Sequence, residues 1–80
     1  MDDKSILRHI EELVNEEHAL FQRSEEGLLE GDEHERLRQL QVNLDQCWDL
    51  LRQRRARRHA GLNPEEARVR DPNIVEHYQQ

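Results

Sequence analysis

The side chains with the most obvious chemistry lie together in the stretch LDQCWDLLRQRRARRHAG, residues 44–61. It contains the only cysteine, Cys47, the only tryptophan, Trp48, and five arginines within seven residues. A reactive cysteine needs a thiol pKa that is lowered by a helix N-terminus, a cation or an imidazole. Cys47 instead stands in the middle of an apolar helical stripe, with Asp45 and Asp49 close in sequence. We therefore expect an unreactive core thiol, beside a tryptophan that anchors the packing.

The arginine cluster allows two interpretations. Clustered arginines bind phosphates through charge and bidentate hydrogen bonds, which would make a nucleic acid or an acidic protein the partner. However, these arginines spread around the helix, and no aromatic residue alternates with them to stack on bases. Cations at a helix C-terminus are favourable on their own, and arginine stems can cover the open end of a bundle. We favour this structural role over contacts with an anionic partner for the whole cluster, which comprises Arg52, Arg54, Arg55, Arg57 and Arg58.

Five histidines raise the question of a metal site. A di-iron centre in a helical bundle needs Glu-x-x-His on two helices, and no histidine here has a glutamate three residues before it. His9, Glu12 and Glu16 share one helix face, but we expect that acidic face to be solvated. The sequence also lacks zinc-ligand spacing, a glycine-rich phosphate loop and a nucleophile elbow. It therefore predicts no metal, no cofactor and no catalytic residue, and we do not expect an enzyme.

Glu17 is a separate question, because it falls at the centre of the apolar arc of the first predicted helix. A lone buried carboxylate is costly unless it has a partner or a raised pKa. Glu17 either fills a solvated gap in the stripe or pairs with an arginine or histidine of a second subunit, which would fix the oligomeric state. A catalytic role is less favoured, since no second titratable group obviously joins it.

Two long helices must position these residues. Ala, Glu, Lys, Leu and Arg make up 39 of the 80 residues, a composition typical of long helices or coiled coils. At about 100° per residue, apolar side chains form one arc of a helix over about residues 5–28 and a stripe along a second helix over about residues 32–60. Asp32 and Glu35 resemble a capping box at the start of the second helix, and Gly61 suits its end.

The tail, residues 61–80, begins with Asn63-Pro64, which predicts a short helical turn near residues 64–68. Pro72 limits the length of that turn. The tail's apolar residues, which are Ile74, Val75 and Tyr78, are expected to pack back on the helices.

A short connection makes the two helices antiparallel neighbours, so the arginines should lie beside Asp2 and Asp3. We expect an all-α single domain, an antiparallel two-helix hairpin with a short C-terminal tail. One hairpin should leave much of each stripe in water, so we expect a homodimer that forms a four-helix bundle. The predicted dimer seam comprises Ile10, Leu13, Glu17, Leu20, Leu40, Leu44, Cys47, Trp48 and Leu51.

The overall charge and apolar pattern bear on localisation. The net charge is −6, and the positive block at residues 52–60 is a local feature of an acidic chain. One cysteine fits a reducing compartment. We see neither a signal-peptide layout nor an apolar run of about 20 residues that would span a membrane. A cytoplasmic protein without membrane partners is the expectation.

The string LDQCWDLLRQRRARR, followed by Asn63-Pro64-Glu65-Glu66, resembles a family of small uncharacterised actinobacterial proteins known as a domain of unknown function. The resemblance covers nearly the whole chain. It implies a small helical protein and brings no activity, ligand or catalytic residue. Our functional expectation is a non-catalytic structural or protein-interaction module that acts as a homodimer with an unidentified protein partner. The alternative is a nucleic-acid-associated regulator that uses the arginine cluster.

Overall fold

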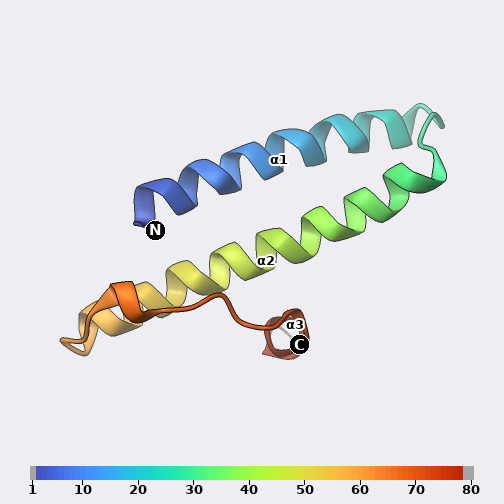
Figure 1. The fold of residues 1–80 in the computed structure, drawn as a ribbon. Coiled ribbons are helices and arrows are strands. Elements are labelled where there is room, and N and C mark those ends of the chain that lie inside the picture. The colour runs from blue at the N-terminus through green and yellow to red at the C-terminus, as the bar shows by residue number, and fades with distance from the viewer. Residues whose placement is uncertain (1, 79–80) are drawn as a thin grey trace.

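The computed structural model describes residues 2–78, and the side chains of residues 2–75. It contains two long helices, α1 (Asp3–Glu25) and α2 (Gly31–His59), then a 3-10 turn, η1 (Pro64–Glu66), and a short helix, α3 (Pro72–Tyr78). Helices α1 and α2 run antiparallel, and the tail folds back beside α2 (Figure 1). The expected all-α hairpin with a C-terminal tail is confirmed. None of the described helices is long and apolar enough to cross a membrane.

Helix α1 ends three residues earlier than the periodicity predicts. Gly27 adopts a positive φ of 72°, a conformation that is easy only for glycine. The N–H of Leu28 donates to the Arg23 carbonyl at 2.9 Å, and that of Gly27 donates to Ser24 at 3.0 Å. These two bonds form a Schellman motif, which satisfies the last carbonyls of α1 and turns the chain back.

Helix α2 starts one residue earlier than expected and uses a different cap. Glu30 is the N-cap, and the Glu33 carboxylate accepts a hydrogen bond from the Glu30 N–H at 3.3 Å. The predicted cap, Asp32, instead lies in the first turn, and Glu35 binds Arg38 at 2.6 Å. The predicted cap was wrong because two pairs of acids have the spacing of a capping box, Glu30 with Glu33 and Asp32 with Glu35, and the sequence pattern does not choose between them.

Helix α2 ends one residue earlier than expected, and its end repeats the motif that closes α1. Gly61 has a φ of 74°, and the N–H of Leu62 donates to the Arg57 carbonyl at 2.8 Å. This turn directs the chain back along α2, so the tail lies against the helix that precedes it. The tail then forms η1, in which the Asn63 side chain caps the Glu65 N–H at 3.0 Å.

Helix α3 was not expected. The Asp71 side chain accepts a hydrogen bond from the Asn73 N–H at 2.8 Å, and Pro72 occupies the first helical position. Proline is favourable there because its missing N–H would have no helical partner. Pro72 therefore begins a helix, where sequence reasoning treated it as a stop. Val75 is 1% exposed, whereas Ile74 stays in solvent and the Tyr78 side chain lies outside the described residues.

The core lies between the two long helices and is closed within one chain. Its members are each at most 8% exposed, and they are Ile6, Ile10, Leu13, Leu20, Leu40, Leu44 and Leu50. Five of these were assigned to the dimer seam, namely Ile10, Leu13, Leu20, Leu40 and Leu44. Packing of α1 on α2 already buries them, because their side chains point toward the partner helix of the same hairpin. Any surface that pairs with another molecule must lie among residues that remain exposed.

Candidate interaction surface

The arginine cluster divides into residues that hold the fold together and residues that face solvent. Arg54 is 5% exposed and joins three segments of the chain. Its guanidinium donates to Asp3 at the start of α1, to the Pro64 carbonyl at 3.2 Å and to Glu65 at 3.2 Å. The antiparallel register predicts this neighbourhood, since it places the end of α2 beside the start of α1.

Arg58 and Arg57 also make ion pairs within the chain. Arg58 donates two hydrogen bonds to Asp3, at 2.6 and 3.3 Å. Hydrogen bonds from Arg58 and Arg54 hold the pKa of Asp3 below its ordinary value. Arg57 contacts Glu66 at 3.4 Å. Three of the five arginines therefore have acidic partners inside the molecule, which supports the structural role for those three.

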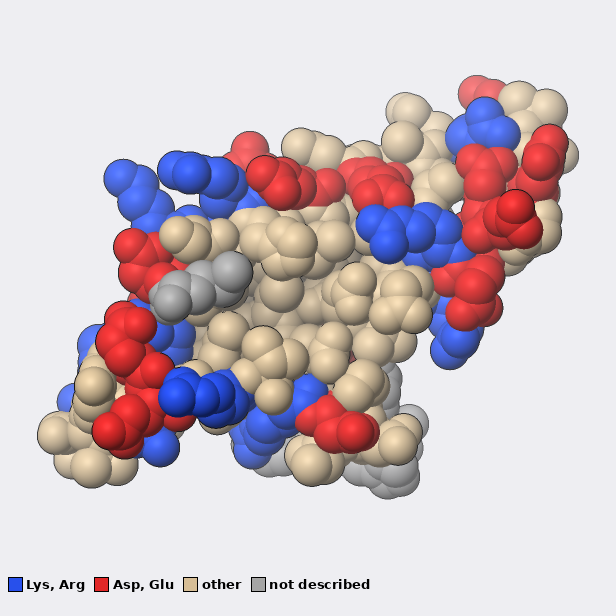
Figure 2. Space-filling view, in the orientation of Figure 1, with Lys and Arg blue, Asp and Glu red and all other residues tan. Residues whose placement is uncertain are grey.

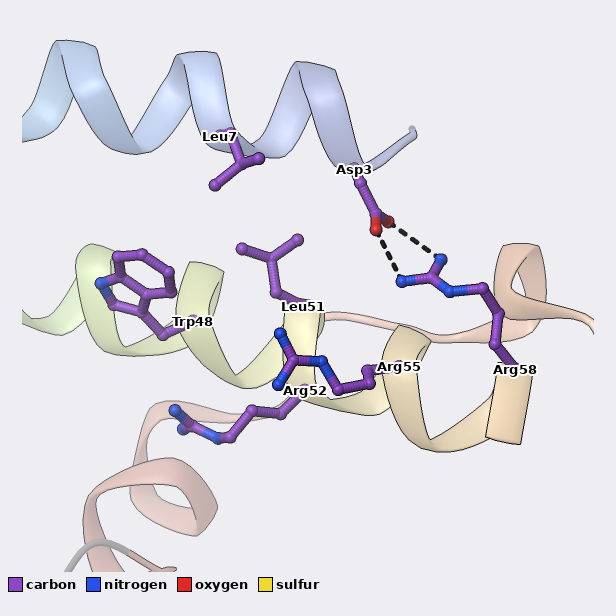
Figure 3. Close-up of a pocket in the computed structure, with 7 residues that line it drawn as sticks. All are labelled: Asp3, Leu7, Trp48, Leu51, Arg52, Arg55 and Arg58. Carbon is purple, nitrogen blue, oxygen red and sulfur yellow. Dashed lines mark hydrogen bonds and ion pairs between the residues drawn. The ribbon is translucent and has the colours of Figure 1, made fainter. Parts of the chain in front are cut away.

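Arg52 and Arg55 differ from the other three. Both are exposed, and neither forms an ion pair with any residue in the described part of the chain. They line an open groove of about 340 Å³ with Asp3, Leu7, Trp48, Leu51 and Arg58 (Figure 3). In the close-up, Leu7 extends from α1 toward Leu51, while Trp48 and the two arginines come from α2. The groove thus has an apolar floor and a cationic border.

Trp48 itself is 43% exposed, and Leu7 is 49% exposed. No aromatic residue alternates with the arginines within residues 52–58, as expected, but Trp48 lines the groove together with Arg52 and Arg55. Trp48, Arg52 and Arg55 stand at i, i+4 and i+7, which places them on one side of α2. That spacing was present in the sequence and would have identified the groove.

A second hollow lies toward the opposite end of α1. His18, Phe21, Gln22 and Glu25 line it, and Phe21 is 40% exposed. Glu25 makes no ion pair with another residue of the described range 2–78. This end of the molecule is rich in acids: residues 25–35 contain six, whereas residues 52–58 contain five arginines. Figure 2 shows several acidic side chains at the turn and an uncharged area between the long helices.

Cys47 lies on a different face, in a hollow with Ile6, His9, Asn43, Gln46, Leu50 and Val69. It is partly buried, and this burial raises the pKa of its thiol. A raised pKa keeps the sulfur protonated and weakly nucleophilic at neutral pH. The environment therefore favours a packing role for Cys47.

Two of the carboxylates considered for metal binding or catalysis, Glu12 and Glu16, lie near basic side chains. Glu16 accepts two hydrogen bonds from Arg36, at 2.5 and 2.8 Å, which lower its pKa. His9 lies 3.9 Å from Glu12. Among the described residues, no three His, Cys, Asp or Glu side chains are placed to hold a metal ion. Glu17 is partly buried, so it lies at the margin of the apolar stripe and not in the core. Leu51, which was also assigned to the dimer seam, is partly buried as well.

Sequence reasoning missed Asp49, which is 2% exposed and is the most buried acid among the side chains of residues 2–75. Arg70 in the tail donates to its two carboxylate oxygens at 2.9 and 2.7 Å, and Gln53 adds a hydrogen bond at 3.0 Å. Burial alone would raise the pKa of Asp49, but these hydrogen bonds outweigh it and lower the pKa. The pair spans 21 residues, and no local pattern indicates it.

Comparison with known proteins agrees with the resemblance. Residues 2–80 match the model of a family described as "Protein of unknown function (DUF2630)". Uncharacterized proteins of Mycobacterium bovis and Mycobacterium tuberculosis are 51% identical to this chain over 77 residues, which cover 95% of it and 88% of each relative. No solved structure matches the chain. With a family model spanning nearly every residue and relatives of this identity, the chain belongs to this family of proteins of unknown function.

Proposed function

We propose that the protein is a non-catalytic interaction module that acts as a homodimer. One observation carries the proposal: Leu7, Phe21 and Trp48 remain 40–49% exposed, although the core behind them is closed. Large apolar side chains that gather on one side of a small protein mark an interaction surface. A second copy that covers this side would complete a four-helix bundle, which is a common arrangement for helical hairpins.

The chemistry of the remaining residues favours binding over catalysis. The thiol pKa of Cys47 is raised, and the pKa values of Asp3 and Asp49 are lowered by arginines that occupy their oxygens. Groups held in this way are poorly suited to act as nucleophiles or general bases near neutral pH. They stabilise the hairpin and its tail, and the exposed groove residues are left for a partner.

Sedimentation velocity tests the homodimer. Over roughly 1–100 µM protein, we expect the mass to shift from one chain toward two as mass action requires. Trp48→Gln should weaken the dimer while circular dichroism stays helical. Leu62→Gln is the matched control, because Leu62 is 55% exposed and lies beyond the end of α2. A folded monomer at every concentration would overturn the proposal.

A nucleic acid is the second candidate, and one observation favours it: Arg52 and Arg55 stand beside the exposed ring of Trp48. Bases stack on aromatic rings, and arginines bind phosphates. A nucleic acid is less favoured because three of the five arginines are already paired with acids of the same chain, which leaves Arg52 and Arg55 to bind phosphates. Two phosphate contacts supply little affinity.

Fluorescence anisotropy with labelled single-stranded and duplex oligonucleotides separates the two candidates. We expect no binding at about 50 mM salt, where phosphate contacts are strong. Binding that is lost in Arg52→Gln/Arg55→Gln would make nucleic acid the favoured partner instead.

A further inference from the structure

We infer that two copies of the chain pair face to face about a two-fold axis that crosses the hairpin at the level of Val14. Each α1 then lies antiparallel on the partner's α1 and each α2 on the partner's α2, so the arginine end of one copy covers the acidic turn of the other. This inference rests on the homodimer proposed above and specifies its interface. It commits the groove beside Trp48 to one occupant, the turn end of a second copy of the chain.

Two rows of side chains form the face that is available for pairing. On α1, Leu7, Val14 and Phe21 stand seven residues apart and fall within about 40° of one another at 100° per residue. The row on α2 has steps of four, three and four residues, which is the spacing of a coiled-coil seam, and it comprises Leu37, Gln41, Leu44 and Trp48. The two rows share a face, because Leu7 and Trp48 line the same groove (Figure 3).

The two rows are centred at the same level of the hairpin. Residues of α1 and α2 at one level have numbers that add to about 56, as three ion pairs show, and these join Arg23 to Glu33, Glu16 to Arg36, and Asp3 to Arg54. The row on α1 is centred on residue 14, and the row on α2 is centred between residues 42 and 43. These two centres lie level with each other, so one two-fold axis passes through both, as a symmetric interface requires.

When the helices of two copies are aligned as in a four-helix bundle, two directions of the axis bring the same face of both copies together. An axis in the plane of the interface and parallel to the helices leaves every level unchanged. It therefore lays α1 on the partner's α2 and joins the two turns. An axis in that plane and perpendicular to the helices reverses the levels. It therefore lays each helix on its own counterpart and joins each turn to the partner's open end.

The distribution of charge favours the perpendicular axis. Residues 25–35 at the turn contain six acids and no lysine or arginine, whereas residues 52–58 contain five arginines and no acid. The parallel axis would bring two acidic turns together, and repulsion between like charges disfavours that arrangement. The perpendicular axis instead places each acidic turn against the arginines that border the partner's groove.

The perpendicular axis determines which residues meet. Facing residues on the two copies of α1 have numbers that add to about 28, so Leu7 meets the partner's Phe21. On α2 the sum is about 85, so Trp48 meets the partner's Leu37 and Arg55 meets the partner's Glu30. Arg55 and Glu30 are exposed, and neither forms an ion pair with another residue of the described range 2–78. Both are therefore available for an intermolecular pair.

A charge exchange tests the contact between Arg55 and the partner's Glu30. One variant carries Arg52→Glu and Arg55→Glu, and the other carries Glu30→Arg. Each variant alone places like charges at both copies of the contact, because two-fold symmetry repeats every pair. We expect each to dimerise at least about tenfold more weakly than the original chain. In a mixture, both contacts of the mixed dimer are complementary, so native mass spectrometry should detect it in preference to either homodimer.

The control pair for the charge exchange is Arg8→Glu and Glu12→Arg, on exposed positions of α1 outside its row. These variants should dimerise as the original chain does and mix without preference. Circular dichroism verifies that every variant is folded, and recovery on mixing shows that a variant retains its face. The parallel axis predicts the opposite result for Glu30→Arg, because that change would relieve repulsion between the two turns and strengthen the dimer.

A disulfide tests the position of the axis. Val14→Cys in a Cys47→Ser background places the thiols of the two copies beside the axis, so oxidised glutathione should link them. Leu7→Cys in the same background is the control, because its two thiols would lie about 21 Å apart along the helices, beyond the reach of a disulfide. A non-reducing gel measures the linked fraction of each variant.

Failure of the homodimer and failure of this interface give different results. If the original chain is a monomer at all concentrations, both proposals are wrong. If it dimerises but the mixed dimer is not preferred, or Leu7→Cys links as readily as Val14→Cys, the homodimer stands and this interface is overturned.

Discussion

Arg70 and Asp49 form a bidentate ion pair between the tail and α2, with donor–acceptor distances of 2.9 and 2.7 Å. The Asp49 side chain is 2% exposed, so the pair places a carboxylate in the interior of a very small protein. The backbone carbonyls of Arg70 and Arg68 also accept hydrogen bonds from α2, from Gln46 at 3.1 Å and from Gln53 at 2.7 Å. The tail is therefore attached to α2 chiefly through polar contacts and Val75.

Arg70→Ala should destabilise the fold by about 1–3 kcal/mol, because it leaves a buried carboxylate with only the Gln53 amide as a partner. Urea denaturation followed by circular dichroism measures the change. Asp49→Asn combined with Arg70→Ala should be less destabilising than Arg70→Ala alone, since the unpaired charge is removed. Equal stability of Arg70→Ala and the original chain would mean that the tail does not depend on this pair.

Arg54→Ala should lower the free energy of unfolding by about 1–3 kcal/mol, because the guanidinium of Arg54 joins α1, α2 and η1 at a buried position. Arg57→Ala is the matched control from the same cluster. Arg57 contacts an exposed glutamate, and exposed pairs contribute less than about 1 kcal/mol. The comparison uses thermal melts of both variants, and similar melting temperatures would show that Arg54 has no special role.

Asp3 should make stability sensitive to acid. Hydrogen bonds from Arg58 and Arg54 keep the pKa of Asp3 below its ordinary value of 3.8. A carboxylate whose pKa is lowered by folding stabilises the protein above its unfolded-state pKa, and this contribution is lost as the pH falls through the folded-state value. The melting temperature should therefore decrease as the pH is lowered below about 4.

The control for this acid effect is Asp3→Asn, which should melt at a lower temperature at pH 7 and lose less in acid. Other carboxylates whose pKa values arginines also lower account for the decrease that remains, and they are Glu16, Glu33, Glu35 and Asp49. If the melting temperature of Asp3→Asn decreases in acid as much as that of the original chain, the effect belongs to other carboxylates.

Cys47 should react slowly with thiol reagents in the folded protein, because burial raises its thiol pKa. Reaction with dithionitrobenzoate at pH 7.5 should be slower in buffer than after unfolding in guanidinium, where the thiol is fully solvated. Absorbance of the released thiolate measures both rates. Rates that agree would indicate an accessible thiol and would contradict the packing role.

Much of the hairpin is predictable, because its information is local. The 3–4 spacing of apolar residues predicts both long helices, and the glycines that end them, Gly27 and Gly61, are visible in the sequence. The antiparallel register follows from the short turn, so the neighbourhood of Asp3 and Arg58 is predictable as well. Helix ends are less certain, since Glu30 and Asp32 are each followed by a glutamate three residues later.

The rest depends on contacts between distant residues. The Asp49–Arg70 pair exists only once the tail returns along α2, and helix α3 is too short for its seven residues to show a period. The depth of burial within one chain was also underestimated. Leu40 is completely buried and Leu44 is 8% exposed without a partner, because α1 and the tail cover α2 from two sides.

Arg54 binds Asp3 near the beginning of the chain and Glu65 beyond its last long helix. The two extremities therefore share one anchor. If the first turn of α1 frays, Arg54 loses one of the contacts that hold its guanidinium in position for Pro64 and Glu65, and loosening of the tail has the reciprocal effect on α1. We expect the terminal segments to open together, which makes so short a polypeptide behave as one cooperative unit.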